Sequence, residues 1–578
     1  MRRAHGSGPQ RAFAGPRTGP AVPSRRPVFC AALSSSVGRS PPTSAVYQKE
    51  KKTVMPRFFA VALLAASHVA APPSQVHLSL DPHAGGTADW APVVGWRSPS
   101  GTGAFVQLGS SPNNLRRTVA AEAYTTHPGM GGATFAFATL RGLAPDTSYW
   151  YRVGSPATGF SAVHNLTAPP VSGAKPTPPW NFLAYGDLGI APTTHEDKLG
   201  QDVRCSSNGT VNADPPGCPD VTLRQLRQNE WDGARLGLRH ELVLHVGDIV
   251  YADYGCNLST NVQWWDSFAT SVQFMAASKP YLICPGNHDL HGRSGPNVEP
   301  GGSSDLESTR YNGRFRMPSR VPVPAGGNTT PTSGPERYYY AYTHRNVRFV
   351  SISTEHSLSP GSEQYTWLEA ELAAADSPAA RAKQPWLLLF GHKPPVCSHA
   401  EVCGEAAVPL GLLAKHHVDL ALWGHLHAYE RTLPMVNTSL AATGGSYHNA
   451  HGTPHVVIGM AGDGFCCGGW SALPPHWSAH REDSFGYARL HVESDASLRF
   501  EYVRNGDGGP VLAGVRDNFT ITKDAVGGGG GSSSSIVWRP TTRRTDEQHE
   551  DLLPPLSDLG HRVHLGSCPE DPEDARRP

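Results

Sequence analysis

The chain has 578 residues, with 49 Lys and Arg balanced by 49 Asp and Glu, so its formal net charge is zero. This length is sufficient for two or three domains, each with its own hydrophobic core. Because no long basic segment accompanies the balanced charge, the composition argues against nucleic acid as a partner.

The first 71 residues have the character of a targeting segment. Residues 1–54 are rich in Arg, Ser, Pro and Ala, and a short apolar stretch with small residues at its end follows Met55. This pattern is typical of a secretory signal, and it is shorter than the roughly 20 apolar residues of a membrane-spanning helix. We expect residues 55–71 to direct the protein to secretion or to a vacuole or lysosome, with no membrane span in the mature chain. The alternatives are an organelle-targeting role for residues 1–54, or translation that starts at Met55.

Cysteines and glycosylation sequons are consistent with an oxidising compartment. None of the ten cysteines forms a CxxC pair, which argues against a zinc ribbon. Two spacings would close small loops and one pair is adjacent: Cys205/Cys218, Cys397/Cys403 and Cys466-Cys467. Six N-x-S/T sequons predict a glycoprotein, and they begin at Asn165, Asn208, Asn257, Asn328, Asn437 and Asn518.

Residues 72–170 contain short alternating apolar runs with turn residues between them, which predicts an all-β sandwich. The runs are Val76–Leu80, Pro92–Trp96, Phe105–Leu108 and Thr134–Ala138. The segment Leu143–Val153 resembles the tyrosine corner of fibronectin type III domains. A Pro-rich linker over residues 169–179 closes this domain.

Residues 178–525 alternate apolar runs with helical patterns, which predicts an α/β domain with buried central strands. Trp264, Phe268, Val272 and Met275 lie on one face of a predicted helix that ends before Pro280. A second helix is predicted from Tyr365, Leu368 and Leu372, with its start near Ser362, and late strands are predicted at 456–458, 487–492 and 498–503.

Two further segments are predicted to lack regular structure. Residues 295–335 are rich in Gly, Pro and Ser, so we expect a long surface loop. The tail, residues 526–578, begins with Gly and Ser repeats and has too little apolar surface to fold alone, so we expect it to be disordered.

Five apolar runs each end in a glycine followed by a polar residue that can bind a metal. The motifs are Gly186-Asp187-Leu188-Gly189, Gly247-Asp248, Gly286-Asn287-His288-Asp289, Gly391-His392 and Gly424-His425-Leu426-His427. A single Gly-Asp after a strand is more often an ordinary turn, and a single buried histidine is usually a core residue. Five such motifs in succession predict strand ends that meet at the ligand crevice of an α/β sheet. The glycines are expected to let the backbone turn sharply, so that each side chain points into that crevice.

These donors suit two metal ions. Oxygen and nitrogen donors without cysteine are typical of hard or borderline divalent and trivalent metals. The set exceeds the three or four ligands of a zinc ion and fits two ions roughly 3.5–4 Å apart with a bridging carboxylate. Its members are Asp187, Asp248, Asn287, His392, His425 and His427.

In this order, the motifs GDLG, GDIVY, GNHD, a histidine after an apolar run and GHLHAYER resemble the signature of the metallophosphoesterases, and among them the purple acid phosphatases. The resemblance covers residues 76–523 and includes Ile352–His356 with the helix at 362–374. It implies an α/β (α+β sandwich) calcineurin-like metallophosphoesterase catalytic domain, preceded by the fibronectin III-like amino-terminal domain of that family.

The resemblance gives Tyr251 a role. The superfamily usually has Asp-x-His in its first motif, but Gly189 stands in the place of that histidine. Tyr251, three residues after Asp248, would replace the lost ligand, and a phenolate favours Fe(III) and would colour the protein. Core packing of Tyr251 is the alternative. The implied ligands of Fe(III) are Asp187, Asp248, Tyr251 and His427, and those of a divalent zinc, manganese or iron are Asp248, Asn287, His392 and His425.

The implied activity is that of an acid phosphatase, a phosphoric monoester hydrolase in which a metal-bound hydroxide attacks small-molecule phosphate esters. His288 is expected to protonate the leaving group or bind phosphate, with a purely supporting role behind the metal ligands as the alternative. His399 is expected to be a second catalytic, phosphate-binding histidine, with an ordinary surface histidine as the alternative. A homodimer is one expected assembly.

The remaining expectations concern three residues of the motifs and two alternative functions. Asp289, where the family more often has Glu, is expected to support His288. Glu430 and Arg431 are expected to form a structural ion pair. The rival functions are a phosphodiesterase or nucleotide pyrophosphatase of the same superfamily, and a non-catalytic metal-binding relative.

Overall fold

The computed structural model describes residues 72–81, 90–126, 130–175, 177–189, 203–205, 211–213, 219–231, 240–254, 258–290, 305–318, 338–399, 403–463, 469–505 and 514–524. The predicted signal and the predicted disordered tail lie outside the described residues, as do Cys218, Cys466 and Cys467 and the sequons at Asn208, Asn257 and Asn328.

The first unit is a sandwich of two antiparallel sheets. One sheet has the order β1 (Ser74–Asp81), β2 (Ala91–Ser98), β6 (Thr134–Thr139) and β5 (Ala123–Thr126). The other has the order β4 (Arg117–Ala120), β3 (Phe105–Gly109), β7 (Ser148–Ser155) and β8 (Gly159–Phe160), and β9 (His164–Thr167) also pairs with β7. Val94 and Trp96 from the first sheet share a core with Val106 and Tyr151 from the second. All four runs predicted to be strands are strands.

The expected tyrosine corner is present. The hydroxyl of Tyr149, at the start of β7, accepts a hydrogen bond of 3.0 Å from the backbone N–H of Ala144. Such a bond to the chain a few residues upstream is the mark of this corner. It fixes the direction in which the chain enters β7.

The second unit contains two mixed sheets. The six-stranded sheet has the order β14 (Tyr281–Cys284), β13 (His240–Val246), β10 (Trp180–Tyr185), β24 (Gly486–Val492), β25 (Ser497–Arg504) and β26 (Gly514–Thr522). The seven-stranded sheet has the order β15 (Tyr340–His344), β16 (Val347–Ser351), β17 (Trp386–Phe390), β18 (Leu420–Trp423), β22 (His455–Ile458), β19 (Tyr429–Thr432) and β23 (Ser478–Glu482). Two short pairs, β11 (Val203–Cys205) with β12 (Val211–Ala213) and β20 (Met435–Val436) with β21 (Ser439–Leu440), lie outside these sheets.

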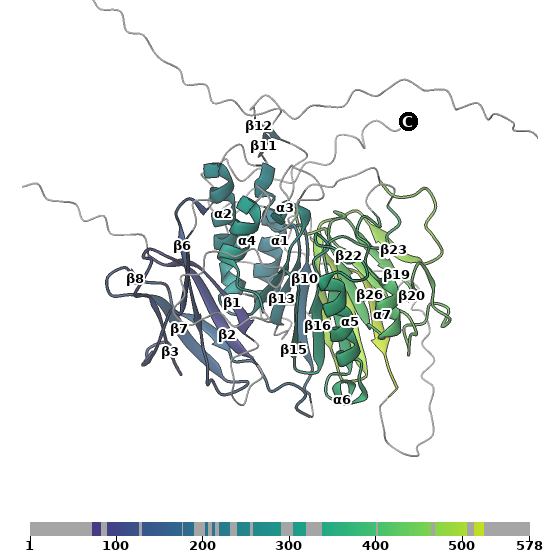
Figure 1. Cartoon of the computed structure of the whole chain (residues 1–578), viewed down its shortest axis with the longest axis horizontal. Helices are drawn as coiled ribbons and strands as arrows, with labels where there is room; N and C mark the ends of the chain where they lie inside the picture. Colours follow the sequence, from purple (N-terminus) through teal and green to yellow (C-terminus); the bar gives the residue numbers. More distant parts are fainter. Residues whose placement is uncertain are drawn as a thin grey trace, which may run out of the picture.

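The two sheets pack face to face and helices cover their outer faces (Figure 1). The rings of Phe182 on β10 and Phe349 on β16 lie 5.3 Å apart across the shared core. On the six-stranded sheet lie α1 (Pro219–Gln225) and α2 (Leu258–Ala276), and on the seven-stranded sheet α5 (Glu363–Ala375) and α7 (Leu410–Lys415). The short helix α6 (Pro378–Arg381) lies below α5 in Figure 1. The predicted strands at 456–458, 487–492 and 498–503 correspond to β22, β24 and β25.

Both predicted helices form as the apolar spacing indicates. Trp264, Phe268, Val272 and Met275 are buried on one face of α2, which ends before Pro280. Helix α5 begins after Ser362, whose hydroxyl accepts a hydrogen bond from the backbone N–H of Tyr365 and so caps the helix. None of the helices within the described ranges is long and apolar enough to cross a membrane.

One expectation about the secondary structure was wrong. The segment 295–335, expected to be a surface loop, contains helix α4 (Asp305–Arg314), whose last turn is buried. Its Arg314 donates a hydrogen bond of 3.1 Å to Asp266 of α2 and lies over the ring of Phe135 on β6. Apolar spacing did not predict this helix, because its buried face carries polar residues. Arg314 on that face packs between the two domains. Tyr151 of β7 adds a second link between them, donating a hydrogen bond of 2.6 Å to the backbone oxygen of Ala277.

Candidate metal centre

The donors of the five motifs follow strands of both sheets. Asp187, Asp248 and Asn287 follow the parallel strands β10, β13 and β14 of one sheet. His392, and the pair His425 and His427, follow the parallel strands β17 and β18 of the other. Since the carboxyl ends of parallel strands share an edge, each sheet contributes one group of donors. The crevice therefore lies between two sheets, and the single open sheet on which it was predicted is too simple a description.

Four of the site residues adopt backbone conformations that L-residues rarely take. The φ angles are 58° at Asp187, 46° at Asp248, 59° at Tyr251 and 70° at His425. Non-glycine residues in this region cost roughly 1–3 kcal/mol each and gather at functional sites. The sharp turns are therefore made partly by the donors themselves, not only by the preceding glycines as expected.

Two of the glycines are required for space. A Cβ at Gly286 would lie 2.1 Å from Oδ1 of Asp248, and one at Gly424 would lie 2.5 Å from Oδ2 of Asp187. Gly247 combines both constraints, because its φ is 86° and its Cβ would lie 2.4 Å from Nδ1 of His392. The glycines let the strand ends approach closely enough for the donors to meet.

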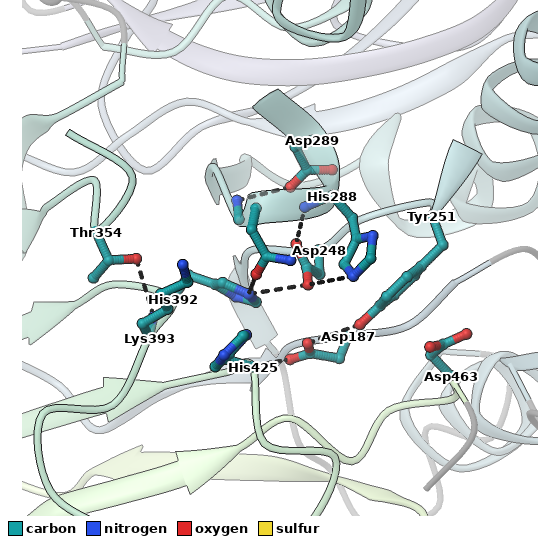
Figure 2. Close-up of polar contacts among 12 residues, drawn as sticks. Asp187, Asp248, Tyr251, His288, Asp289, Thr354, His392, Lys393, His425 and Asp463 are labelled. Carbon is teal, nitrogen blue, oxygen red and sulfur yellow. Dashed lines mark hydrogen bonds and ion pairs between the residues drawn. The ribbon is translucent and has the colours of Figure 1, made fainter. Parts of the chain in front are cut away.

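Tyr251, Asp187 and His427 form one half of the site. The Tyr251 hydroxyl donates a hydrogen bond of 2.9 Å to Oδ1 of Asp187 and lies 2.7 Å from Nε2 of His427. That nitrogen is 3.4 Å from the same Asp187 oxygen. Figure 2 shows the Tyr251 side chain reaching across to the Asp187 carboxylate. This contact argues against core packing alone as the role of Tyr251.

Asp248, Asn287, His392 and His425 form the other half. Nε2 of His392 lies 3.0 Å from Oδ2 of Asp248 and 3.2 Å from Oδ1 of Asn287. Donor atoms of Asp248, His392 and His425 all lie within 4.8 Å of one another. The other nitrogen of His392, Nδ1, lies 3.0 Å from the backbone oxygen of Val246. A proton on Nδ1 would be donated there, leaving Nε2 to face the site.

The electrostatics of the site fit the binding of cations. Although burial opposes ionisation, His392 and His288 hold the pKa of Asp248 well below its usual range. Burial raises the pKa of Tyr251, and Asp187 and Asp248 raise it further. Burial lowers the pKa of His392, but Asp248 and Asp187 outweigh it and raise the value to about 10. A protonated imidazole thus balances the carboxylates, and a metal ion would replace its proton, since a ligating imidazole is neutral.

His288 lies beside this set and is held by a carboxylate that the sequence analysis did not identify. Its Nδ1 is 2.8 Å from Oδ2 of Asp253, and its backbone N–H donates a hydrogen bond of 2.8 Å to Oδ1 of Asp248. Burial lowers the pKa of His288, but Asp248 and Asp253 outweigh it and raise the value to about 9. Asp253 is two residues after Tyr251, so its position directly after the GDIVY motif could have indicated a carboxylate near the site.

Asp289 was expected to support His288, but it contacts other residues. Its carboxylate accepts hydrogen bonds of 3.0 Å and 2.9 Å from the backbone N–H groups of Ile249 and Gly286. Burial, reinforced by Asp248, raises the pKa of Asp289 to about 8. Asp289 therefore ties two donor loops together, whereas Asp253 holds His288.

The expected ion pair between Glu430 and Arg431 does not form. Neighbouring residues on β19 point to opposite faces of the sheet. Arg431 makes a two-pronged contact with Asp517 at 2.7 Å and 3.0 Å. Glu430 accepts hydrogen bonds from the backbone N–H of Ser398 at 2.7 Å and the hydroxyl of Ser478 at 2.6 Å. Both residues are structural, with different partners from those predicted.

His399 is placed on a neighbouring loop. It is buried, forms a β-bridge with Trp470, and its ring centroid lies 5.7 Å from that of Trp470. A disulfide joins Cys397 and Cys403, so the predicted small loop is closed around His399. The alternative of an ordinary surface histidine is therefore wrong, while the catalytic role stays a prediction.

Charged residues beyond the predicted donors lie around His425. Nζ of Lys393 lies 3.3 Å from Glu355 and 3.5 Å from Glu405, and the same Oε2 of Glu405 lies 3.3 Å from Nε2 of His425. Lys393 directly follows the predicted ligand His392. No motif in the sequence near Glu405 indicates that it lies at the site. Glu405 lies two residues after Cys403, whose disulfide with Cys397 closes the preceding loop.

Comparison with known proteins gives consistent results along the chain. Residues 73–168 match the purple acid phosphatase N-terminal domain, residues 181–429 the calcineurin-like phosphoesterase family, and residues 452–512 the iron/zinc purple acid phosphatase-like protein C domain. The predicted fold class is thus confirmed. The structure is similar to a solved structure of the purple acid phosphatase PPD1 from yellow lupin seeds, with a TM-score of 0.61 and 23% sequence identity. The similarity covers 78% of this chain and 75% of that one.

Several curated relatives share about the same level of identity. "Probable inactive purple acid phosphatase 1" of Arabidopsis thaliana is 28% identical, over 75% of this chain and 65% of its own length. "Acid phosphatase type 7" of Homo sapiens is 29% identical, over 76% of this chain and 90% of its own. A "Nucleotide pyrophosphatase/phosphodiesterase" of Hordeum vulgare is 28% identical, over 61% of this chain and 86% of its own. The chain spans just under two thirds of the Arabidopsis relative.

Proposed function

Because this chain belongs to the purple acid phosphatase family, we propose that it is an acid phosphatase that hydrolyses phosphate monoesters with a ferric and a divalent metal ion. The observation that carries the proposal is the meeting of Tyr251 with donors from all five motifs at one place between the sheets. Four of the site residues have strained backbone conformations, which cost free energy and cluster at functional sites. This strain supports a functional role for the site over a purely structural one.

We assign each ion the set of ligands that the family resemblance implies. Asp187, Tyr251 and His427 would hold the ferric ion, with a phenolate as the hard anionic donor. Asn287, His392 and His425 would hold the divalent ion, which we take to be zinc, manganese or iron. Asp248 would bridge the two. When bound, the two ions supply Lewis-acid chemistry, by lowering the pKa of water and neutralising charge on the phosphate.

The residues of this chain would then handle the leaving group. His288 stands next to the bridging Asp248 and is oriented by Asp253, so its Nε2 faces the site with a proton to give. Transfer of that proton to the departing alkoxide oxygen would release the alcohol. We also propose that His399 is a second phosphate-binding histidine, because a disulfide closes the short loop that carries it. Glu405, two residues beyond that loop, lies beside His425.

The proposal is tested by metal analysis together with a visible absorption spectrum and an assay at mildly acidic pH. We expect two metal equivalents, one of them iron, a band from phenolate-to-iron charge transfer, and hydrolysis of p-nitrophenyl phosphate. A colourless oxidised protein with at most one metal equivalent would contradict it. Since some relatives bear names that include "probable inactive", hydrolysis by the metal-loaded protein is the first result needed.

A second candidate function is hydrolysis of phosphodiesters or nucleotide pyrophosphates, suggested by the name of the barley relative. Comparing p-nitrophenyl phosphate with bis(p-nitrophenyl) phosphate on the same preparation separates the two. A higher kcat/KM for the diester would favour the second candidate.

We further propose that the protein is a secreted or vacuolar glycoprotein. Three sequons, at Asn165, Asn437 and Asn518, lie in the described residues and all three asparagines are exposed. The test is expression in a eukaryotic host followed by treatment with an N-glycosidase. No change in electrophoretic mobility would contradict the proposal.

A further inference from the structure

Asp463 is a buried aspartate that none of the five motifs includes. It lies in the loop after β22, which runs parallel to β18, so this loop leaves the same sheet edge as the one that carries His427. The backbone N–H of Asp463 donates a hydrogen bond of 2.9 Å to the backbone oxygen of Asp187. The residue is only 3% exposed. Asp463 is therefore fixed, through the backbone, to a ligand of the ferric half of the site.

The side chain of Asp463 contacts the far side of the His427 ring. Oδ2 of Asp463 lies 3.7 Å from Nδ1 of His427, whereas Nε2 of the same ring lies 2.7 Å from the Tyr251 hydroxyl. The first distance is longer than that of a hydrogen bond. A carboxylate behind a ligating histidine fixes its ring orientation and raises its basicity as a donor.

Asp463 also lies next to the position of the missing histidine. A Cβ built at Gly189 would be 3.6 Å from Oδ1 of Asp463, so a side chain there would meet this carboxylate. In place of a neutral ligand at position 189, the chain has a buried negative charge on this side (Figure 2). With Asp187 and Asp248 it is the third aspartate around Tyr251.

We propose that Asp463 is a positioning residue for the ferric ion, which orients His427 and, through its negative charge, stabilises iron in the ferric state. The inference rests on the proposed ferric–phenolate centre. An added negative charge in a buried site stabilises a trivalent ion more than a divalent one, because the attraction scales with the product of the charges. The reduction potential of a metal site depends on such neighbouring charges and contacts.

The test compares Asp463→Asn with Asp463→Glu in the full-length, iron-loaded protein. The asparagine retains the shape and an oxygen toward His427 but removes the charge, whereas the glutamate retains the charge. We measure the visible band, the reduction potential by dithionite titration with mediators, and the affinity of the apoprotein for iron. In the asparagine variant we expect a band at longer wavelength, a higher potential and an iron affinity lower by about 10- to 100-fold. The glutamate variant should remain close to the wild type in band and potential.

The possible results separate the inference from the proposed function. An asparagine variant that binds iron with the wild-type band and potential would overturn the role of Asp463 and leave the proposed function intact. A wild-type protein without a band would overturn both. The asparagine variant could also lose iron altogether. In that case, a glutamate variant that still binds iron supports the inference. If both variants lose iron equally and their melting temperatures are unchanged, the argument from the charge of Asp463 is overturned.

Discussion

The hydroxyl of Tyr251 lies 2.7 Å from Nε2 of His427, although 176 residues separate them in the chain. Tyr251 follows β13 of the six-stranded sheet and His427 follows β18 of the seven-stranded sheet, so the contact joins loops of the two sheets. The same hydroxyl donates to Asp187. A phenol placed among carboxylates and an imidazole has the surroundings of a metal ligand and not those of a core tyrosine.

Replacing Tyr251 with phenylalanine should abolish the visible band and reduce the iron content, since the phenolate oxygen is lost while the ring still packs against His288 at a centroid distance of 4.5 Å. The protein should remain folded. Absorption spectroscopy and metal analysis check this. Tyr340→Phe is the matched control, because Tyr340 is equally buried but donates its hydrogen bond to the backbone oxygen of Ile283. A band that persists in Tyr251→Phe would exclude Tyr251 as a ligand.

Replacing His288 with alanine should lower kcat in a way that depends on the leaving group. Loss of a general acid costs roughly 100- to 10,000-fold where the leaving alcohol needs a proton. p-Nitrophenolate departs without one, so the loss should be much smaller for p-nitrophenyl phosphate than for an alkyl phosphate. Steady-state assays on both substrates, with metal content measured alongside, test this. Equal losses would mean that His288 only binds phosphate, and His451→Ala, at an exposed histidine, is the control.

Replacing Gly286 with alanine should damage metal binding, because its Cβ would lie 2.1 Å from Oδ1 and 2.5 Å from the backbone nitrogen of Asp248. Overpacking of this kind costs about 1–3 kcal/mol, and relieving it would displace the carboxylate of Asp248. Isothermal titration of the apoprotein with zinc should show weaker binding. Gly101→Ala is the control, since a Cβ there meets nothing within 4 Å. Wild-type affinity in Gly286→Ala would contradict the close approach.

The stability of the fold should fall as the pH drops below about 6.5. Burial lowers the pKa of His455 to about 3, and its Nδ1 accepts a hydrogen bond of 3.1 Å from Nε1–H of Trp423. In the unfolded chain this histidine takes up a proton near pH 6.5, so its contribution is complete above that pH and is lost as the pH falls toward 3. At pH 5 the loss is roughly 2 kcal/mol.

Denaturant unfolding at pH 7.5, 6 and 5 measures this dependence. His455→Asn retains an acceptor for Trp423 and removes the titrating ring, so its stability should change less with pH than that of the wild type. His476→Asn, at an exposed position, should keep the full dependence. Identical pH slopes for His455→Asn and the wild type would show that His455 does not remain neutral in the folded protein.

The motifs and both helices could be predicted from the sequence because they depend on local rules. Apolar residues at every second position indicate a strand, and apolar residues three and four positions apart indicate a helix. A glycine followed by a polar residue indicates the end of a strand. Such rules place Asp187, Asp248, Asn287, His392 and His425 at strand ends without reference to the rest of the chain. The family resemblance added Tyr251. Helix α4 was missed because its buried face carries Arg310 and Arg314 in place of an apolar stripe.

The sequence by itself determined which residues could bind metals and the order in which strands deliver them. Only the tertiary structure decided which charged groups stand behind those residues: Asp253 at His288, Asp463 at His427, and Asp517 in place of Glu430 as the partner of Arg431. The first two contacts each join loops that follow neighbouring strands of one sheet, and the third joins strands of the two sheets. Such pairing depends on sheet order and burial, which the residue patterns that predict strands and helices do not specify.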